Sequence, residues 1–486
     1  MNVRTFPQCS IPHSRTSAVV DFDIFKAQSL SIPAVRFPNL DNGSPQTLAK
    51  AQNQRLLQAL AYEPNIHFAI KKPEDDVGGE RRPNNTFAHG AGVSSIDIDR
   101  WEGKYLLSGG ADSSVAIWDL ENEESIGENI VYIPLGYATR TSTTASLGIT
   151  QVSFYPFDSL AFLTTGYDHT LKLFSSETLQ ASASFDLGST VYSHDTSKVA
   201  SHLLVACASQ HPAVRLMDLR TGSGTHSLAG HSGSVLSVAW HPKNEHVLAS
   251  GATDGTCRLW DVRKSASSLG VLDMDDSIGV TGYDGKGSGA RRRERGRAHT
   301  GAVNGLAWTS DGLFLASNGH DERLRIWDMM TGANTLANFG PALKNPHMTV
   351  LTPLIVPSHL SALSSEMIYY PNPTEILGFD MHAGNLLKRL RVPGLQRPQA
   401  AGGAVRNINN RTTALAWRAH NVEMFSSHAD GTIRCWRPRI WEDSVDETES
   451  QGHEDDAESE LAERKRKREE LDSIVNDLTK KRVTFS

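Results

Sequence analysis

Cysteine is scarce in this sequence, and long apolar runs are missing from it. The four cysteines, Cys9, Cys207, Cys257 and Cys435, are too few and too scattered for a disulfide framework or a zinc site, which favours a reducing compartment. No apolar run approaches the ~18 residues that a membrane helix needs. The first residues lack the basic-then-apolar order of a signal peptide. We therefore expect neither secretion nor membrane contact.

Motifs for cofactor chemistry are also missing. The sequence has no Walker loop, no dinucleotide-binding fingerprint and no Cys/His cluster with metal spacing. Its 486 residues, 39% of them hydrophobic, and its net charge of −7 allow one large repeat domain with tails. We therefore predict no cofactor, no metal and no catalytic residue, and expect the protein to act by recognition.

A repeated unit organises the middle of the chain. Residues 230–263 begin with Gly-His, end just past Trp-Asp, and contain short apolar runs around an Asp-Gly turn. This order, over about 40 residues, is typical of a propeller blade. The same four residue types recur at nearly constant spacing in three units: His89, Ser108, Asp112 and Trp118; His231, Ser250, Asp254 and Trp260; His299, Ser317, Asp321 and Trp327.

These recurring residues predict buried polar networks. A half-buried histidine needs partners, and a turn aspartate, a strand serine and a tryptophan N–H can satisfy one another. A Ser/His/Asp set also suggests a hydrolase, but that interpretation would place a separate active site in every unit. We therefore assign the three sets a structural role.

Weaker copies of the unit follow the same strand pattern at 150–174, 203–219, 367–380 and 413–436. We therefore predict an all-β fold, a seven-bladed propeller over 83–440 that closes because an open sheet edge is a liability. The strand just before His89 is expected to complete the last blade. A Gly- and Arg-rich stretch, 264–297, is expected to be a flexible insertion, and 441–486 an acidic and then basic tail that is partly helical.

An amphipathic helix is predicted near 46–62, within an N-terminal arm formed by 1–82. Leu48, Leu56, Leu57 and Leu60 cluster on one of its sides at helical spacing. One interpretation is a helix packed across the rim of the propeller. The other is a helix that docks into a groove of a partner protein.

Two neighbouring units end in the same way. Met217-Asp218-Leu219-Arg220 and Trp260-Asp261-Val262-Arg263 both place an arginine two residues after the aspartate. An arginine at this place can project from the strand end toward a carboxylate or carbonyls of another protein.

Several segments resemble the Cockayne syndrome group A protein family. They are GKYLLSGGADSSVAIWDLEN at 103–122, TVYSHD at 190–195, HPAVRLMDLRTGS at 211–223, NGLAWTSDGLFLASNGHDERLRIWD at 304–328 and GANTLANFG at 332–340. The resemblance covers roughly 87–436 and suggests the preceding helix as well. The sequence departs from it in the insertion 264–297, the linker 386–411 and the basic C-terminal segment.

The resemblance implies a substrate receptor of a cullin-4 RING ubiquitin ligase that acts in transcription-coupled nucleotide excision repair. It implies that Arg220 and Arg263, with Asp218 and Asp261, contact the damage-binding adaptor of the ligase. It implies that the helix from Leu48 to Leu60 inserts between the adaptor's propellers. Repair factors at stalled RNA polymerase II would then be held on the opposite part of the ring.

The charged segments favour a nuclear protein. Basic clusters at 464–468 and 480–482 have the spacing of a nuclear import signal. The competing hypothesis is a nuclear scaffold that binds nucleic acid or ribonucleoprotein through these clusters and through Arg291 to Arg297, which predicts steep salt dependence. A hydrolase that uses one His/Ser/Asp set is a third hypothesis.

Overall fold

The structure, a computed structural model, describes residues 45–70, 87–126, 129–140, 147–264, 268–274, 296–361, 366–393, 411–418 and 421–439, without the side chains of 45–51. The arm before residue 45, most of the predicted insertion and the tail 441–486 lie outside this description. Among the described residues, no helix has the length and apolar character needed to cross a bilayer.

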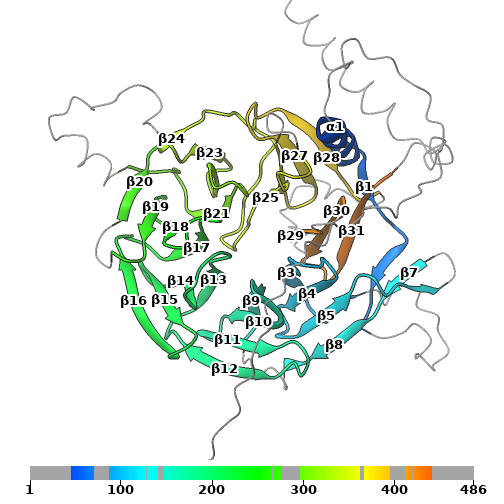
Figure 1. The fold of residues 1–486 in the computed structure, drawn as a ribbon, viewed down its shortest axis with the longest axis horizontal. Helices are drawn as coiled ribbons and strands as arrows, with labels where there is room; N and C mark the ends of the chain where they lie inside the picture. Colours follow the sequence, from blue (N-terminus) through cyan, green and yellow to red (C-terminus); the bar gives the residue numbers. More distant parts are fainter. Residues whose placement is uncertain are drawn as a thin grey trace, which may run out of the picture. The chain divides into compact units, whose positions relative to one another are not determined.

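Strands form a ring of sheets (Figure 1). Seven sheets have four antiparallel strands. In six of them the chain runs from an inner strand outward, and in the last sheet the outer strand is β1, which comes from the N-terminal part of the chain. The first four of these sheets are β3 (Val93–Ile98), β4 (Tyr105–Gly110), β5 (Val115–Asp119) and β8 (Pro134–Ala138); β9 (Ile149–Tyr155), β10 (Asp158–Gly166), β11 (Thr170–Ser175) and β12 (Ala181–Asp186); β13 (Val191–Thr196), β14 (Leu204–Ser209), β15 (Ala213–Asp218) and β16 (Ser223–Ala229); β17 (Val235–Trp240), β18 (Val247–Ala252), β19 (Cys257–Asp261) and β20 (Ser268–Leu272).

The other three four-stranded sheets complete the ring. They are β21 (Val303–Trp308), β22 (Phe314–Gly319), β23 (Leu324–Asp328) and β24 (Ala333–Asn334); β25 (Leu354–Ile355), β26 (Met367–Pro371), β27 (Ile376–Asp380) and β28 (Leu386–Leu390); β29 (Thr412–Arg418), β30 (Glu423–His428), β31 (Ile433–Pro438) and β1 (Leu60–Tyr62). β20 lies within the stretch predicted as a flexible insertion, and its residues instead form the outer strand of their sheet.

The predicted number of seven sheets is wrong, because the described residues form eight. The eighth sheet has three strands, β2 (Ile66–Phe68), β7 (Asn129–Tyr132) and β6 (Glu124–Ile126), and β2 runs parallel to β7. These strands come from the N-terminal arm and from a stretch that reads as a polar connection. Each has only three or four residues, which is too short for alternation of apolar and polar residues to stand out.

The strand that closes the ring differs from the predicted one. β1 pairs with β31, with Leu60 opposite Pro438 and Tyr62 opposite Trp436. The predicted strand just before His89 is therefore not the one that completes this sheet. Because β1 directly follows an amphipathic helix, its apolar residues continue the helical pattern and conceal the change from helix to strand.

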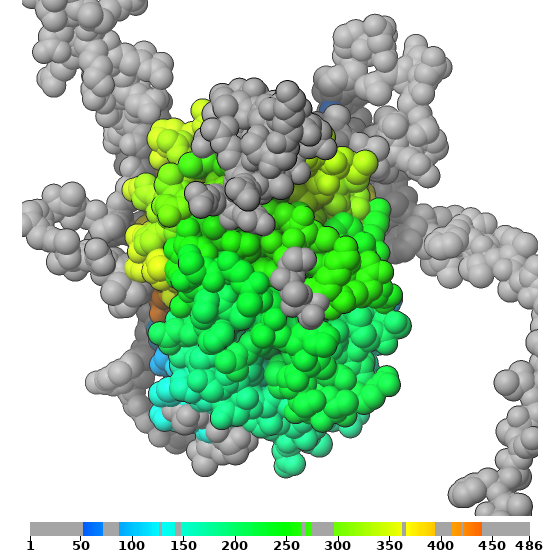
Figure 2. All heavy atoms as spheres, turned by 90° about the vertical axis from the view of Figure 1, so that its left-hand side faces the viewer, coloured from blue at the N-terminus to red at the C-terminus, as the bar shows by residue number. Residues whose placement is uncertain are grey.

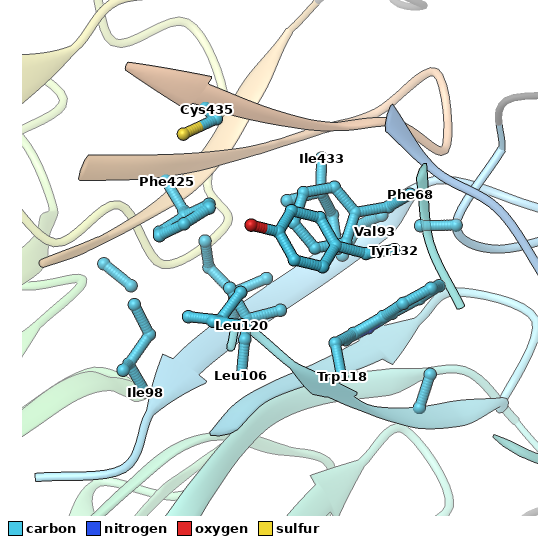
Figure 3. Packing of buried hydrophobic residues seen from close by; sticks show 14 of the residues in the cluster. Phe68, Val93, Ile98, Leu106, Trp118, Leu120, Tyr132, Phe425, Ile433 and Cys435 are labelled. Carbon is cyan, nitrogen blue, oxygen red and sulfur yellow. The ribbon is translucent and has the colours of Figure 1, made fainter. Parts of the chain in front are cut away.

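The eighth sheet covers the junction between the first and the last units of the ring. Phe68 stacks on Tyr132, with ring centroids 4.9 Å apart, and its edge contacts Trp118 and Phe425 (Figure 3). Trp118 belongs to the first four-stranded sheet and Phe425 to the last. A single buried aromatic side chain therefore joins three sheets, in addition to the backbone pairing of β1.

The described part of the chain has one helix, α1 (Pro45–Gln58). Leu57 and Leu60 are fully buried with Val356, Met367 and Trp436, and the Tyr369 hydroxyl donates to the Leu57 carbonyl at 3.2 Å. These two leucines therefore pack across the rim of the chain's own ring, and their side chains are not accessible to a partner. Leu60 also lies in β1 rather than in the helix, Leu56 is half-buried, and the side chain of Leu48 lies outside the description.

Candidate functional site

One face of the ring carries the turns that follow the first and the third strand of each four-stranded sheet. We call it the arginine face. Hydrogen bonds connect neighbouring turns around it: Arg418 Nε to Gly103 O at 2.7 Å, Trp101 Nε1 to Pro156 O at 3.1 Å, Ser201 N to Glu245 Oε2 at 2.9 Å, His241 Nε2 to Gly312 O at 3.2 Å, and Ser310 Oγ to Ser358 Oγ at 2.8 Å. These bonds tie the turns of neighbouring sheets together at five places around the face.

Turn aspartates set what this face presents. In five sheets the aspartate that ends the third strand accepts a hydrogen bond from the backbone N–H two residues later. The side chain that follows is free to vary, and the residues at this position are Glu121, Arg220, Arg263, Met330 and His382. The aspartate is therefore a turn former, and the residue two positions later is the variable one.

Arg263 is held by its aspartate. Its Nε donates to Asp261 Oδ1 at 3.0 Å and its Nη2 to Oδ2 at 2.8 Å, a bidentate pair. The hydrogen bonds from Arg263 lower the pKa of Asp261 to about 2. The Arg263 side chain is still 64% exposed, so its outer edge is presented to solvent in a fixed orientation.

Arg220 occupies the equivalent position on the preceding sheet. Its backbone N–H donates to Asp218 Oδ1 at 2.9 Å, and its side chain is exposed with no ion-pair partner among the described residues. The two sheets are neighbours, because the Trp240 backbone N–H donates to Asp195 Oδ2 at 2.6 Å. Figure 2 views the ring from the side on which these sheets lie next to each other. Both arginines thus stand on one face of adjacent sheets.

Exposed apolar side chains lie on the same face. They belong to the turns after the first and third strands: Trp101, 58% exposed, Phe157, 45%, Val199, 46%, Leu313, 45%, and Met330, 80%. They are spread over four sheets of the ring, so this face offers apolar as well as cationic contacts to a partner.

The recurring His, Ser, Asp and Trp residues are brought together inside three sheets. Ser250 Oγ lies 2.7 Å from both Trp260 Nε1 and His231 Nε2, and the other two sets repeat this geometry within 0.1 Å. In the first two sets the serine accepts from tryptophan and donates to histidine, which leaves the histidine Nδ1–H to donate toward the aspartate. In the third set Arg325 Nη1 also lies 2.6 Å from His299 Nδ1. Burial lowers the pKa of each of the three histidines, that of His89 to about 4, so all three are neutral at pH 7.

The residue two positions after the aspartate decides how the histidine reaches it. Thr256 Oγ1 lies 2.8 Å from His231 Nδ1 and donates to Asp254 at 2.7 Å, and Ser114 bridges His89 and Asp112 in the same way. In the third set this residue is an arginine with no hydroxyl, and His299 Nδ1 meets Asp321 directly at 2.9 Å.

A fourth polar set lies in the last sheet, and sequence reasoning missed it. Trp436 Nε1 donates to Ser426 Oγ at 2.8 Å, and the imidazole comes from His428, whose Nε2 lies 2.9 Å from that oxygen. Ser426, Asp430 and Trp436 have the same spacing as in the other sets, which was the available signal. The histidine comes from the strand itself rather than from the position before the first strand.

The serines of these sets are unsuited to nucleophilic attack. Ser108, Ser250 and Ser317 are fully buried, and each accepts a tryptophan N–H. A nucleophile must reach its substrate, so this geometry does not support the hydrolase hypothesis.

We predict that Ser250→Ala lowers the free energy of unfolding by about 1–3 kcal/mol, because Trp260 Nε1 and His231 Nε2 lose their partner in a buried site. Urea denaturation measures the effect. Ser227→Ala is the control, because Ser227 is an exposed serine of the preceding sheet. Equal stabilities of the two variants would contradict the structural role.

Another buried histidine joins two neighbouring sheets. His194 lies 2.7 Å from Ser153 Oγ and 3.0 Å from Thr165 Oγ1, and burial lowers its pKa to about 3. An unfolded chain takes up this proton near pH 6.5, so the stability that neutral His194 contributes is present above pH 6.5 and is lost as the pH falls toward 3. Burial raises the pKa of the adjacent Asp195 to about 6, which acts in the opposite direction.

We therefore predict that the stability advantage of the native chain over His194→Gln shrinks by about 2 kcal/mol between pH 7.5 and pH 5. The Asp195 contribution is common to both chains and cancels in this difference. Denaturant titrations across the pH range measure it. A difference that is independent of pH would show that the pKa of the imidazole is the same in the folded and the unfolded chain.

Comparisons with known proteins agree with the repeat pattern. The family model "WD domain, G-beta repeat" matches residues 81–119, 222–261 and 293–328, which contain all residues of the three His/Ser/Asp/Trp sets. These three stretches are therefore WD repeats, and propellers built from such repeats typically serve as non-catalytic interaction scaffolds.

Individual relatives extend this similarity. The chain is 28% identical to the WD repeat-containing protein ATCSA-1 of Arabidopsis thaliana over 412 residues, which cover 72% of this chain and 86% of that protein. It is 25% identical to the ribosome biogenesis protein YTM1 of Chaetomium thermophilum, covering 61% of this chain and 62% of that protein. It is 26% identical to the radiation-sensitive protein 28 of Saccharomyces cerevisiae, covering 41% and 43%.

Proposed function

We propose that this protein is the substrate receptor of a nuclear cullin-4 RING ubiquitin ligase that acts in transcription-coupled nucleotide excision repair. The similarity to ATCSA-1 across 86% of that protein supports the proposal. The observation that carries it is the position of Arg220 and Arg263 on one face of adjacent sheets, with exposed apolar side chains on the same face. The damage-binding adaptor of the ligase is the partner proposed for this face.

The helix contributes to the proposed docking surface by its position. Its last turn adjoins the end of β31 on the arginine face, where the Arg439 N–H donates to the Ala59 carbonyl at 3.1 Å. Since Leu57 is buried, the helix would present its other side, which includes the exposed Gln52 and Gln58. The proposed docking unit is therefore the arginine face with the outer side of α1, in place of the leucine side.

Affinity purification of the full chain from nuclear extract, followed by mass spectrometry, tests the proposal. We expect the adaptor and the cullin to co-elute, together with repair factors at stalled RNA polymerase II. The similarity to YTM1 supports a second candidate, a nuclear scaffold in ribonucleoprotein assembly. Co-elution of pre-ribosomal proteins without a cullin would favour that candidate and contradict the ligase.

A further inference from the structure

A small cationic pocket lies on the face opposite the arginine face. Its walls come from three places: the loop before β25, the turn between β26 and β27, and the residue that precedes β29. The basic side chains on these walls are Lys344, His347 and Arg411, and no Asp or Glu is among the lining residues. The pocket is therefore an electropositive recess rather than one half of an ion-pair network.

Arg411 is the centre of this pocket. One Nη donates to Thr349 Oγ1 at 3.3 Å, but the buried Nε has no hydrogen-bond partner and no described carboxylate pairs with the guanidinium. Burial lowers its pKa, the direction expected when a cation loses water without gaining a counter-ion. An uncompensated half-buried charge is costly, so the site favours an anion from outside.

The sequence around the pocket supplies no such anion. No Asp or Glu stands between Asp328 and Glu366, the stretch that provides one wall, and none occurs in 392–410, which directly precedes Arg411. The acidic residue on the neighbouring turn, Glu375, already pairs with Arg389 and Arg391. The positive charge at Arg411 is therefore left uncompensated by the adjacent chain.

The pocket is a narrow recess that opens to solvent. Its enclosed space is about 10 Å³, which is about enough for one water-sized group. One oxygen of a carboxylate or a phosphate can therefore enter, while the rest of the group stays at the mouth. Pro346, Pro371 and Pro373 fix its walls, and buried Asn345 is locked by bonds to Asn304 and to the Gly319 carbonyl. The site is thus formed before a ligand arrives, which reduces the entropy lost on binding.

We propose that this pocket, centred on Arg411, binds the oxyanion of an acidic segment of a partner polypeptide, either a carboxylate side chain or a phosphorylated residue. The guanidinium offers its Nη nitrogens to the oxygens of the incoming group, and arginine commonly binds carboxylate and phosphate with such donors. The pocket leaves the arginine face free, so the ring can hold two proteins at once. The inference does not depend on the ligase assignment, because the purified chain alone shows the binding.

Fluorescence anisotropy with labelled peptides tests this inference on the full chain. Three peptides share one sequence except for a central run of glutamates, phosphoserines or glutamines. We expect both acidic peptides to bind and the glutamine peptide not to bind, and their relative affinities identify carboxylate or phosphate as the preferred group. Equal binding of the glutamine peptide would overturn the proposal.

Matched variants show whether the pocket is responsible. Arg411→Gln should weaken the acidic peptides about tenfold or more, whereas Arg323→Gln, which removes an exposed arginine of the same face outside the pocket, should leave them unchanged. Equal losses would mean general charge attraction and would refute the site. Lys344→Gln changes an exposed lining residue, should weaken binding to a lesser extent, and decides the question if Arg411→Gln fails to fold. Preference for a single-stranded RNA over the acidic peptides would also overturn the proposal.

Discussion

Phe68→Ala should lower the free energy of unfolding by about 3–5 kcal/mol, the range for truncation of a buried phenylalanine. Phe68 is 1% exposed and contacts Trp118, Tyr132 and Phe425, so the variant leaves a cavity between three sheets at once. The surrounding strands are pinned by backbone pairing and cannot easily collapse into the gap. Denaturant unfolding measures the loss.

Two controls separate ring closure from ordinary core packing. Phe157→Ala removes a side chain that is 45% exposed and should change stability by less than about 0.5 kcal/mol. Phe162→Ala truncates a fully buried phenylalanine in a sheet away from the junction and should be about as destabilising as Phe68→Ala. Only Phe68→Ala is expected to raise native-state hydrogen exchange at β1 and β31. Equal exchange in both core variants would show that the eighth sheet does not hold the ring closed.

The contrast between what was predicted at this junction and what was missed has a physical origin. The inner strands and their turns were visible in the sequence because each combines an apolar run with a fixed aspartate, as at Asp254 and Asp430. β1, β2 and β6 are only three residues long, and their partners are distant in sequence or formed by polar stretches. Pairing with distant strands determines such elements, and local pattern does not reveal it.

The helix shows that local sequence pattern is equally limited in locating a binding site. Its spacing of leucines established an amphipathic side, but an apolar side fits a partner's groove as well as the chain's own rim. Only the tertiary contacts of Leu57 with Met367 and Trp436 decide between them. The arginine pattern was more informative, because the turn aspartate fixes the direction of the following residues. The sequence alone was therefore enough to place Arg220 and Arg263 at equivalent positions of neighbouring units.

Arg411 was missed for a related reason. Its significance lies in what its surroundings lack, and three separate segments create those surroundings. A charge count over the whole chain gives −7 and hides a region without acidic residues. The long stretch without Asp or Glu before Glu366 was the available signal, but it gains meaning only when the fold brings it next to Arg411.

The double variant Arg220→Ala/Arg263→Ala should weaken binding of the damage-binding adaptor by about 2–5 kcal/mol, which is about 30-fold to several thousand-fold in Kd. Co-purification of the adaptor with the chain measures this loss. Both side chains project from turns of one face, and their removal leaves partner carboxylates or carbonyls without donors in a buried interface. Stability should change by less than about 0.5 kcal/mol, because both side chains are exposed in the free chain.

The single substitutions sharpen this expectation. Arg263→Lys keeps the charge but loses the bidentate contact with Asp261, so it should restore only part of the binding. Asp261→Asn leaves Arg263 in place but weakens the hydrogen bonds that orient it. A loss of adaptor binding comparable to that of Arg263→Lys would show that the orientation of Arg263 matters in addition to its charge. Arg323→Ala, on the opposite face, should leave adaptor recovery unchanged. Full recovery of the adaptor with the double variant would remove the arginine face from the proposed interface, even if the chain still purified with a cullin.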